Sequence, residues 1–179
     1  TLSASNKIAT SKKIASIVQT KLFRPYVSDD VIGSQIAGAT KNVYAIACGV
    51  VEGKKFGKNA VASIISRSFA EVSRLNKSMR AKPETLSGLS GMGDLFLTCS
   101  SKKSRNFKLG LDLASGMSLS SIIQKNSSIA EGVFTARALK QLSLKKKLNL
   151  PIAETVYQIL YRKKNSDHAI EELLNRPIG

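Results

Sequence analysis

Apolar side chains recur at helical spacing over some twenty residues near the start of the chain. The set consists of Ile32, Ile36, Ala39, Val43, Ile46 and Val50. This period places them on one face of a long helix. Because a helix with such a face must be covered by other elements, we expect this segment to lie at the centre of the fold. Gly38 and Ala37 are small, and we expect another backbone to approach the helix there.

Beyond residue 30 the sequence predicts helices only. Several residue types mark helix starts, namely Asn59, Pro83, Ser104, Ser118 and Pro151. A glycine-rich turn is expected at residues 88–94, followed by Leu95, Phe96 and Leu97 as a short buried segment. The last helix is expected from about Ser166 to Leu174. We therefore expect residues 31–179 to form one all-α domain of about seven or eight helices.

The first 30 residues have a different pattern. Residues 1–4 and 23–27 resemble strands, and between them a helix is expected that begins with Thr10 or Ser11 as its cap. Two strands and one helix cannot bury a sheet on both faces. We therefore expect residues 1–30 to be a β-α-β remnant, the end of a larger α/β domain whose front lies outside this sequence.

Charge and composition exclude some classes of protein and leave others open. The chain has 28 Lys and Arg against 12 Asp and Glu, a net charge of +16. Such a charge fits a basic helical module that binds nucleic acid or a membrane surface. However, the lysines are scattered in small pairs, and no nucleic-acid-binding motif is recognisable. No apolar run reaches the length of about 18 residues that a transmembrane helix needs.

The sequence predicts no metal site. The two cysteines, Cys48 and Cys99, lie in apolar surroundings without metal-ligand spacing, and His168 is the only histidine. We expect both cysteines to be reduced core residues of a cytosolic protein, and His168 to lie at the surface.

Lys41 interrupts the apolar helix and is followed by Asn42. A lysine in this position is most often a surface residue whose stem covers apolar neighbours. The alternative is a lysine held in a cleft, where it can take and return a proton.

Two further polar clusters can each be interpreted either as an ordinary structural feature or as part of a functional site. Asp94 follows Gly91 and Gly93, and it is either an ordinary capping aspartate or a carboxylate that orients Lys41. Ser104, Arg105 and Asn106 begin a helix. A capping hydroxyl, a guanidinium and an amide at a helix N-terminus favour a phosphate, although a solvated basic helix start has the same composition.

Five short strings in this chain resemble one family in order and spacing. They are Gly38–Asn42, Gly91–Leu95, Thr98–Cys99, Ser104–Asn106 and Glu131–Gly132. The family is that of the bacterial NAD(P)-dependent glycerol-3-phosphate dehydrogenases, and the resemblance covers nearly the whole chain. It implies that residues 1–30 end a Rossmann domain. It also implies that residues 31–179 form an all-α domain of the 6-phosphogluconate dehydrogenase C-terminal-like fold.

The resemblance also implies an activity and roles for individual residues. The family interconverts glycerol 3-phosphate and dihydroxyacetone phosphate with NAD or NADP, and so supplies phospholipid synthesis in the cytoplasm. By resemblance, Lys41 accepts the proton when the alcohol is oxidised, and Asp94 holds the substrate and the lysine. The implied substrate-phosphate residues are Ser104, Arg105 and Asn106, and the implied cofactor contacts are Arg105, Ile129 and Glu131.

The chain departs from the family in that it contains no dinucleotide-binding fingerprint, since Gly88, Gly91 and Gly93 give a different spacing with no strand before them. We therefore expect these 179 residues to be inactive alone. Two alternatives stay open beside the dehydrogenase. One is the basic binding module, and the other is a dehydrogenase of the same superfamily with a different hydroxy substrate. A homodimer also stays open.

Overall fold

The computed structural model describes residues 2–3, 8–125 and 128–174. The N-terminal part contains β1 (Leu2–Ser3), α1 (Ile8–Val18) and β2 (Val27–Ser28). Within the described residues only helical elements follow: α2 (Val31–Gly53), α3 (Lys58–Ser78), α4 (Pro83–Ser87), the π-helical turn η1 (Leu89–Gly93), α5 (Asp94–Ser100), α6 (Arg105–Ala114), α7 (Leu119–Lys125), α8 (Glu131–Lys146), α9 (Pro151–Tyr161) and α10 (Ser166–Leu174). The expected all-α class is confirmed.

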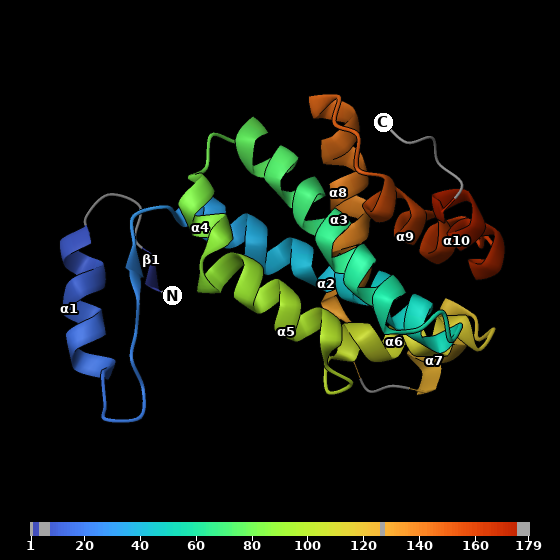
Figure 1. Cartoon of the computed structure of the whole chain (residues 1–179), viewed down its shortest axis with the longest axis horizontal. Coiled ribbons are helices and arrows are strands. Elements are labelled where there is room, and N and C mark those ends of the chain that lie inside the picture. The colour runs from blue at the N-terminus through green and yellow to red at the C-terminus, as the bar shows by residue number, and fades with distance from the viewer. Residues whose placement is uncertain (1, 4–7, 126–127, 175–179) are drawn as a thin grey trace.

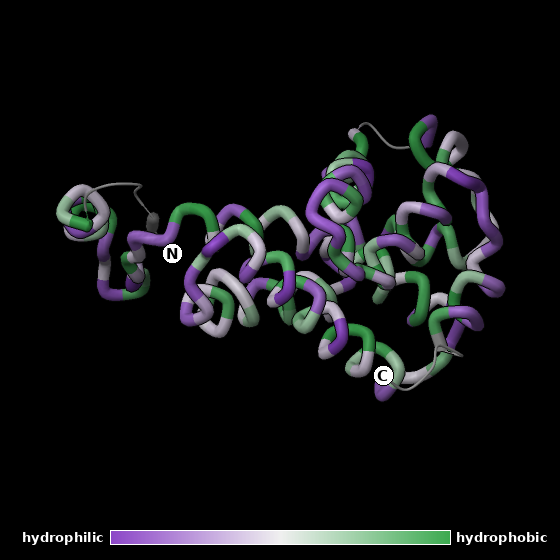
Figure 2. The backbone as a smooth tube through the Cα atoms, turned by 90° about the horizontal axis from the view of Figure 1, so that it is seen from above, coloured by the Kyte–Doolittle hydropathy of each residue, from purple (hydrophilic) through white to green (hydrophobic). Residues whose placement is uncertain are grey.

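The N-terminal unit is a small β-α-β arrangement. Its two strands are parallel, with Leu2 opposite Val27 and Ser3 opposite Ser28. The unit projects from one end of the helical body (Figures 1 and 2), and α10 lies at the other end (Figure 1). The second strand begins later than expected, and Thr1 and Ala4 of the first expected strand lie outside the described residues. The division of the chain into domains at residue 30 stays a prediction.

The start of α1 differs from the prediction. The helix begins at Ile8, so Thr10 and Ser11 lie inside it and do not cap it. Ser11 is buried, and its hydroxyl has no hydrogen-bond partner.

Helix α2 runs through the centre of the helical body, as expected (Figure 1). Asp30 caps it by accepting a hydrogen bond from the backbone N–H of Gly33 at 2.9 Å, and its other carboxylate oxygen accepts from the N–H of Lys82. The expected one-sided burial is wrong, because residues 42–51 are buried on all sides while Ile32 and Ala39 are exposed. The reason is that α3, α5, α6, α8 and α9 all pack on α2.

The closest backbone approach to α2 occurs at Gly49, not at Gly38. A Cβ on Gly49 would lie 2.1 Å from the carbonyl oxygen of Phe107, and a Cβ on Gly110 would lie 2.2 Å from that of Ile46. No atom comes within 4 Å of a Cβ placed on Gly38. The two glycines therefore let α2 and α6 touch, which fixes α6 against the centre of the domain.

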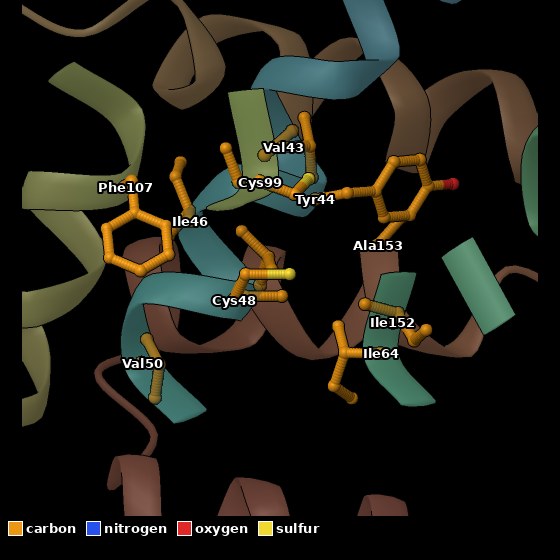
Figure 3. Close-up of a cluster of buried hydrophobic side chains, with 14 of the residues drawn as sticks. Val43, Tyr44, Ile46, Cys48, Val50, Ile64, Cys99, Phe107, Ile152 and Ala153 are labelled. Atoms are coloured by element: carbon orange, nitrogen blue, oxygen red, sulfur yellow. The ribbon is translucent and has the colours of Figure 1, made fainter. Parts of the chain in front are cut away.

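The core surrounds the second half of α2. Figure 3 shows Val43, Ile46 and Val50 among side chains from α6 and α9, such as Phe107 and Ile152. Both cysteines are free and buried in this core, as expected. His168 is at the surface, with 76% of its side chain exposed.

A buried carboxylate that the sequence analysis missed joins three helices of this core. Glu71 on α3 accepts hydrogen bonds from the backbone N–H groups of Ile152 at 2.6 Å and Ala153 at 3.2 Å. The hydroxyl of Tyr44 on α2 also donates to it, at 3.2 Å. Because Pro151 is the first residue of α9, Glu71 satisfies the next free donors of that helix.

Two local predictions between α3 and α5 are wrong. Helix α3 begins at Lys58, so Asn59 lies inside it and is not its cap. The expected glycine-rich turn is a π-helical turn that leads directly into α5. Of the segment expected to be buried, only Leu95 is buried, whereas Phe96 and Leu97 are exposed.

No described helix is long and apolar enough to cross a membrane.

Candidate functional site

Lys41 and Asp94 form an ion pair between α2 and α5. The ammonium Nζ of Lys41 donates to Oδ2 of Asp94 at 2.5 Å. The two side chains are 24% and 32% exposed, so the pair is partly accessible to solvent and does not lie in the core. Lys41 and Asp94 are 53 positions apart in the sequence. The packing of α5 against α2 brings them together.

Thr98 supports the carboxylate of this pair, and the sequence analysis did not assign it a role. Its hydroxyl donates to the carbonyl oxygen of Asp94 at 2.6 Å and lies 3.3 Å from Oδ1 of the same residue. Thr98 is one turn after Asp94 in α5, so the spacing of four residues was the available signal. With Oδ1 beside the hydroxyl and Oδ2 on Lys41, the carboxylate is held in one orientation.

A chain of amide hydrogen bonds connects Asn42, the residue after Lys41, to the start of α6. Nδ2 of Asn106 donates to Oδ1 of Asn42 at 3.0 Å, and Nδ2 of Asn42 donates to Oε2 of Glu131 at 3.2 Å. The backbone N–H of Gly132 donates to Oδ1 of Asn106 at 2.9 Å. Since Asn42 follows Lys41 and Asn106 follows Arg105, these bonds join the two polar clusters.

The structure places Asn106 deeper than a residue that simply faces a ligand. Its side chain is buried, and both ends of its amide are occupied by protein partners. Gly132 permits this arrangement, because a Cβ there would lie 2.6 Å from Oδ1 of Asn106 and 2.8 Å from the carbonyl oxygen of Asn42. The glycine after Glu131 is therefore needed for the close approach of α8 to α2 and α6.

The N-terminus of α6 presents cationic and polar groups at the surface. Ser104 caps the helix, its hydroxyl accepting from the N–H of Phe107 at 3.3 Å. Arg105 is exposed and donates to the hydroxyl of Ser128 at 3.1 Å. A helix N-terminus with a guanidinium beside it is suited to bind a phosphate.

Beside Arg105 lies a small pocket between α6, α7 and α8. Its volume is about 230 Å³, and Lys108, Leu109, Ile129 and Val133 are among the residues that line it. Glu131 is exposed at the start of α8 but does not line this pocket. A guanidinium beside an apolar wall is suited to hold a phosphate next to an apolar group.

The buried cysteines do not belong to the polar site. The Cys99 thiol lies 4.0 Å from the carbonyl oxygen of Lys41. Its hydrogen bond with Cys48 and its burial raise the pKa of the Cys99 thiol, so the group stays protonated. Among the described residues no group of three or more His, Cys, Asp or Glu side chains is arranged to hold a metal ion.

Comparisons with known proteins identify relatives over nearly the whole chain. The family model described as "NAD-dependent glycerol-3-phosphate dehydrogenase C-terminus" matches residues 30–171. A glycerol-3-phosphate dehydrogenase [NAD(P)+] of Novosphingobium aromaticivorans is 47% identical over 166 residues, which are 93% of this chain and 50% of the relative. One of Prosthecochloris aestuarii is 44% identical over 175 residues, 98% of this chain and 53% of the relative.

Solved structures agree with these relatives. The crystal structure of a glycerol-3-phosphate dehydrogenase from Coxiella burnetii superposes with a TM-score of 0.92 at 36% identity, covering 96% of this chain and 53% of that one. The yeast enzyme of Saccharomyces cerevisiae superposes with a TM-score of 0.80 at 29% identity, covering 89% and 47%. The chain thus spans about half the length of the relatives it matches. Because the family model matches well over half of its residues, the chain belongs to the NAD-dependent glycerol-3-phosphate dehydrogenase family and corresponds to the C-terminal domain of that family.

Proposed function

We propose that this chain supplies the substrate-binding and proton-transfer half of an NAD(P)-dependent glycerol-3-phosphate dehydrogenase. The reaction is the interconversion of sn-glycerol 3-phosphate and dihydroxyacetone phosphate. The observation that carries the proposal is the Asn42–Asn106 hydrogen bond, because it joins the Lys41–Asp94 pair to the anion-binding start of α6. A substrate with a hydroxyl at one end and a phosphate at the other needs these two features side by side.

In this proposal Lys41 transfers the proton. A carbinol carbon gives up hydride readily only when its hydroxyl proton is removed. In the oxidative direction the Lys41 ammonium first releases one proton to solvent, and the neutral amine then accepts the proton of the substrate hydroxyl. Asp94, held by Thr98, keeps the lysine in position and accepts a hydrogen bond from a substrate hydroxyl. In the reductive direction the Lys41 ammonium returns the proton to the alkoxide.

The start of α6 binds the phosphate. Ser104, Arg105 and the free N–H groups of the helix present donors to the anion, and Asn106 positions them through Asn42 and Gly132. Because a phosphate fits this site and a simple carboxylate leaves donors unused, a phosphorylated substrate is favoured over other hydroxy substrates of the superfamily.

The cofactor contacts from this half are Arg105, Ile129 and Glu131. When bound, the nicotinamide of NAD or NADP supplies the hydride acceptor or donor. Arg105 would pair with a phosphate, Glu131 would accept from a ribose hydroxyl, and Ile129 would cover the apolar wall of the pocket. Metal independence, a cytoplasmic location and a homodimer complete this proposal.

The test uses a protein that carries this chain behind a dinucleotide-binding half, assayed with dihydroxyacetone phosphate and NADH or NADPH. Lys41→Met is expected to lower kcat by at least about 100-fold while KM changes little, because the lost group acts in the transition state. Lys12→Met, at an exposed position on α1, serves as the control and keeps full turnover. Unchanged kcat in Lys41→Met, or no reaction with dihydroxyacetone phosphate, would overturn the proposal.

A further inference from the structure

The outer face of the α8–α9 hairpin concentrates positive charge. Residues 132–164 carry eight basic side chains and one acidic side chain. The buried residues of both helices, such as Val133, Leu139 and Val156, pack toward α2, so the charged residues lie on the opposite side. In Figure 1 the hairpin lies at the α10 end of the molecule, far from α1. The net charge of the chain is therefore not spread evenly over its surface.

Most cations on this face have no acidic partner. All acidic residues of the chain lie in described segments, and none of them pairs with Lys145, Lys147 or Arg162. Lys140 pairs with Glu154 at 2.7 Å, while Arg137 lies over the ring of Tyr161. The uncompensated charges are thus available to a ligand.

A shallow groove of about 670 Å³ runs between the two helices on this face. Its lining includes Lys140, Leu144, Glu154, Tyr157, Arg162 and Lys164. A second hollow, of about 380 Å³, shares Lys140 and Leu144 with it and is also lined by Lys147. Cations and a phenol around an open hollow of this size match a phosphodiester headgroup.

Apolar side chains are exposed among these cations. Leu144 is 64% exposed, and Phe134 is 60% exposed. Helical spacing places Phe134, Arg137, Gln141, Leu144 and Lys145 along one stripe of α8. Exposed leucine and phenylalanine flanked by lysine and arginine are typical of helices that lie in a membrane interface.

The charge and the apolar groups together select one partner. A second copy of the same face would bring like charges together, which disfavours a symmetric contact. Duplex nucleic acid would pair with the cations but would leave Leu144 without a partner. An anionic bilayer offers phosphate groups to the cations and an acyl boundary to Leu144. We propose that the outer face of the α8–α9 hairpin binds the surface of an anionic phospholipid membrane, with headgroup phosphates in the groove and Leu144 at the acyl boundary.

The first experiment measures sedimentation of the 179-residue chain with vesicles of equal parts phosphatidylglycerol and phosphatidylcholine. The chain is expected to bind these vesicles and not vesicles of phosphatidylcholine alone. The triple variant Lys145→Gln, Lys147→Gln, Arg162→Gln is expected to bind about a hundredfold more weakly, since each cation near an anionic leaflet contributes roughly a fivefold factor. Equal binding to both kinds of vesicle, or no binding to either, would overturn the proposal.

A matched control separates this face from the overall charge. The triple variant Lys12→Gln, Lys13→Gln, Lys21→Gln removes the same charge from exposed positions on and after α1. It is expected to bind within about twofold of the unchanged chain when salt gives a Debye length of about 8 Å. An equal loss of binding in both triple variants would show attraction to net charge only and would refute a specific face. Circular dichroism spectra identical to that of the unchanged chain establish that each variant is folded.

A fluorescent reporter tests insertion at Leu144. The chain contains no tryptophan, so Leu144→Trp gives a single emitter. Its emission is expected to shift to shorter wavelength on phosphatidylglycerol vesicles, whereas Leu97→Trp, at a position on α5 that is 66% exposed, shows no shift. If Leu144→Trp stays unshifted, or if duplex DNA at equal phosphate concentration displaces the vesicles, the partner is not a bilayer and the inference fails. This result does not depend on the proposed dehydrogenase activity.

Discussion

Asn106 donates a hydrogen bond to Asn42 at 3.0 Å, and this contact joins helices that begin 74 residues apart. Each asparagine directly follows a residue to which we assign chemistry, Lys41 in one case and Arg105 in the other. Together with the Gly49 and Gly110 contacts, this side-chain bond holds the part of α2 that carries Lys41 against the start of α6, where we propose proton transfer and anion binding. Neither amide is exposed enough for water to replace its partner easily.

Removing either amide is expected to destabilise the fold. Asn42→Ala and Asn106→Ala should each lower the free energy of unfolding by about 1–3 kcal/mol, because each leaves a buried polar partner unsatisfied. The double variant should lose less than the sum of the two, with a coupling of about 1 kcal/mol. Urea unfolding of the four proteins measures this cycle. Strict additivity would show that the two side chains do not interact.

Gly132→Ala is expected to destabilise the chain by about 2 kcal/mol, because the added methyl group collides with Asn106 and with the backbone of Asn42. Gly38→Ala is the matched control. It is also a helical glycine, but its Cβ meets no atom within 4 Å, and the change should stabilise the chain by about 0.5–1 kcal/mol. Thermal unfolding of both variants checks the opposite signs, and a destabilised Gly38→Ala would contradict the packing described for α2.

Periodicity predicted the central helix and the all-α class, but it could not predict how α2 is surrounded. A repeat of apolar residues indicates which face is most apolar, whereas burial depends on how many neighbours arrive from elsewhere in the sequence. Tyr44 and Asn42 are buried on α2 because Glu71 and Asn106 meet them, and those partners lie 27 and 64 residues away. The glycines before Asp94 predicted a turn, but they could not indicate that it is the π-helical turn found here.

Short strings predicted the residues of the candidate site, but they did not predict how these residues are arranged. Local spacing gives Ser104 as a cap and could have given Thr98 as the partner of Asp94. The 2.5 Å contact between Lys41 and Asp94 depends on the crossing of α2 and α5, which no local pattern encodes. For Asn106 the string implied a substrate contact, which stays a prediction, while the structure shows its buried amide bonded to Asn42 and Gly132.

The 179-residue chain alone is expected to show no oxidoreductase turnover. It contains no dinucleotide-binding fingerprint, and orientation of the nicotinamide against the substrate carbon accounts for much of the rate in such enzymes. The measurement is NADH oxidation with dihydroxyacetone phosphate, using the purified chain at high concentration. Steady turnover that is lost in Lys41→Met would contradict this expectation.

Glu71 is expected to make stability depend on pH near neutrality. Burial raises the pKa of its carboxyl group to about 7, although hydrogen bonds from Ile152, Ala153 and Tyr44 favour the charged form. The unfolded value is 4.5, so the protonated carboxyl is favoured by folding. Its contribution to the free energy of unfolding is complete below pH 4.5 and is lost as the pH rises through about 7.

Glu71→Gln tests this pH dependence, because glutamine keeps an acceptor for the N–H groups of α9 and does not titrate. From pH 4.5 to pH 8 the unchanged chain should lose about 3 kcal/mol relative to the variant, as expected for a shift of this size. Asp30 does not contribute to this difference. Burial raises the pKa of its carboxyl group, but hydrogen bonds from Gly33 and Lys82 lower it more. The pKa of Asp30 therefore lies below its usual value of 3.8. Urea unfolding at pH 4.5 and pH 8 gives the two differences. Parallel pH profiles for both proteins would show that Glu71 is already ionised in the folded chain near pH 5.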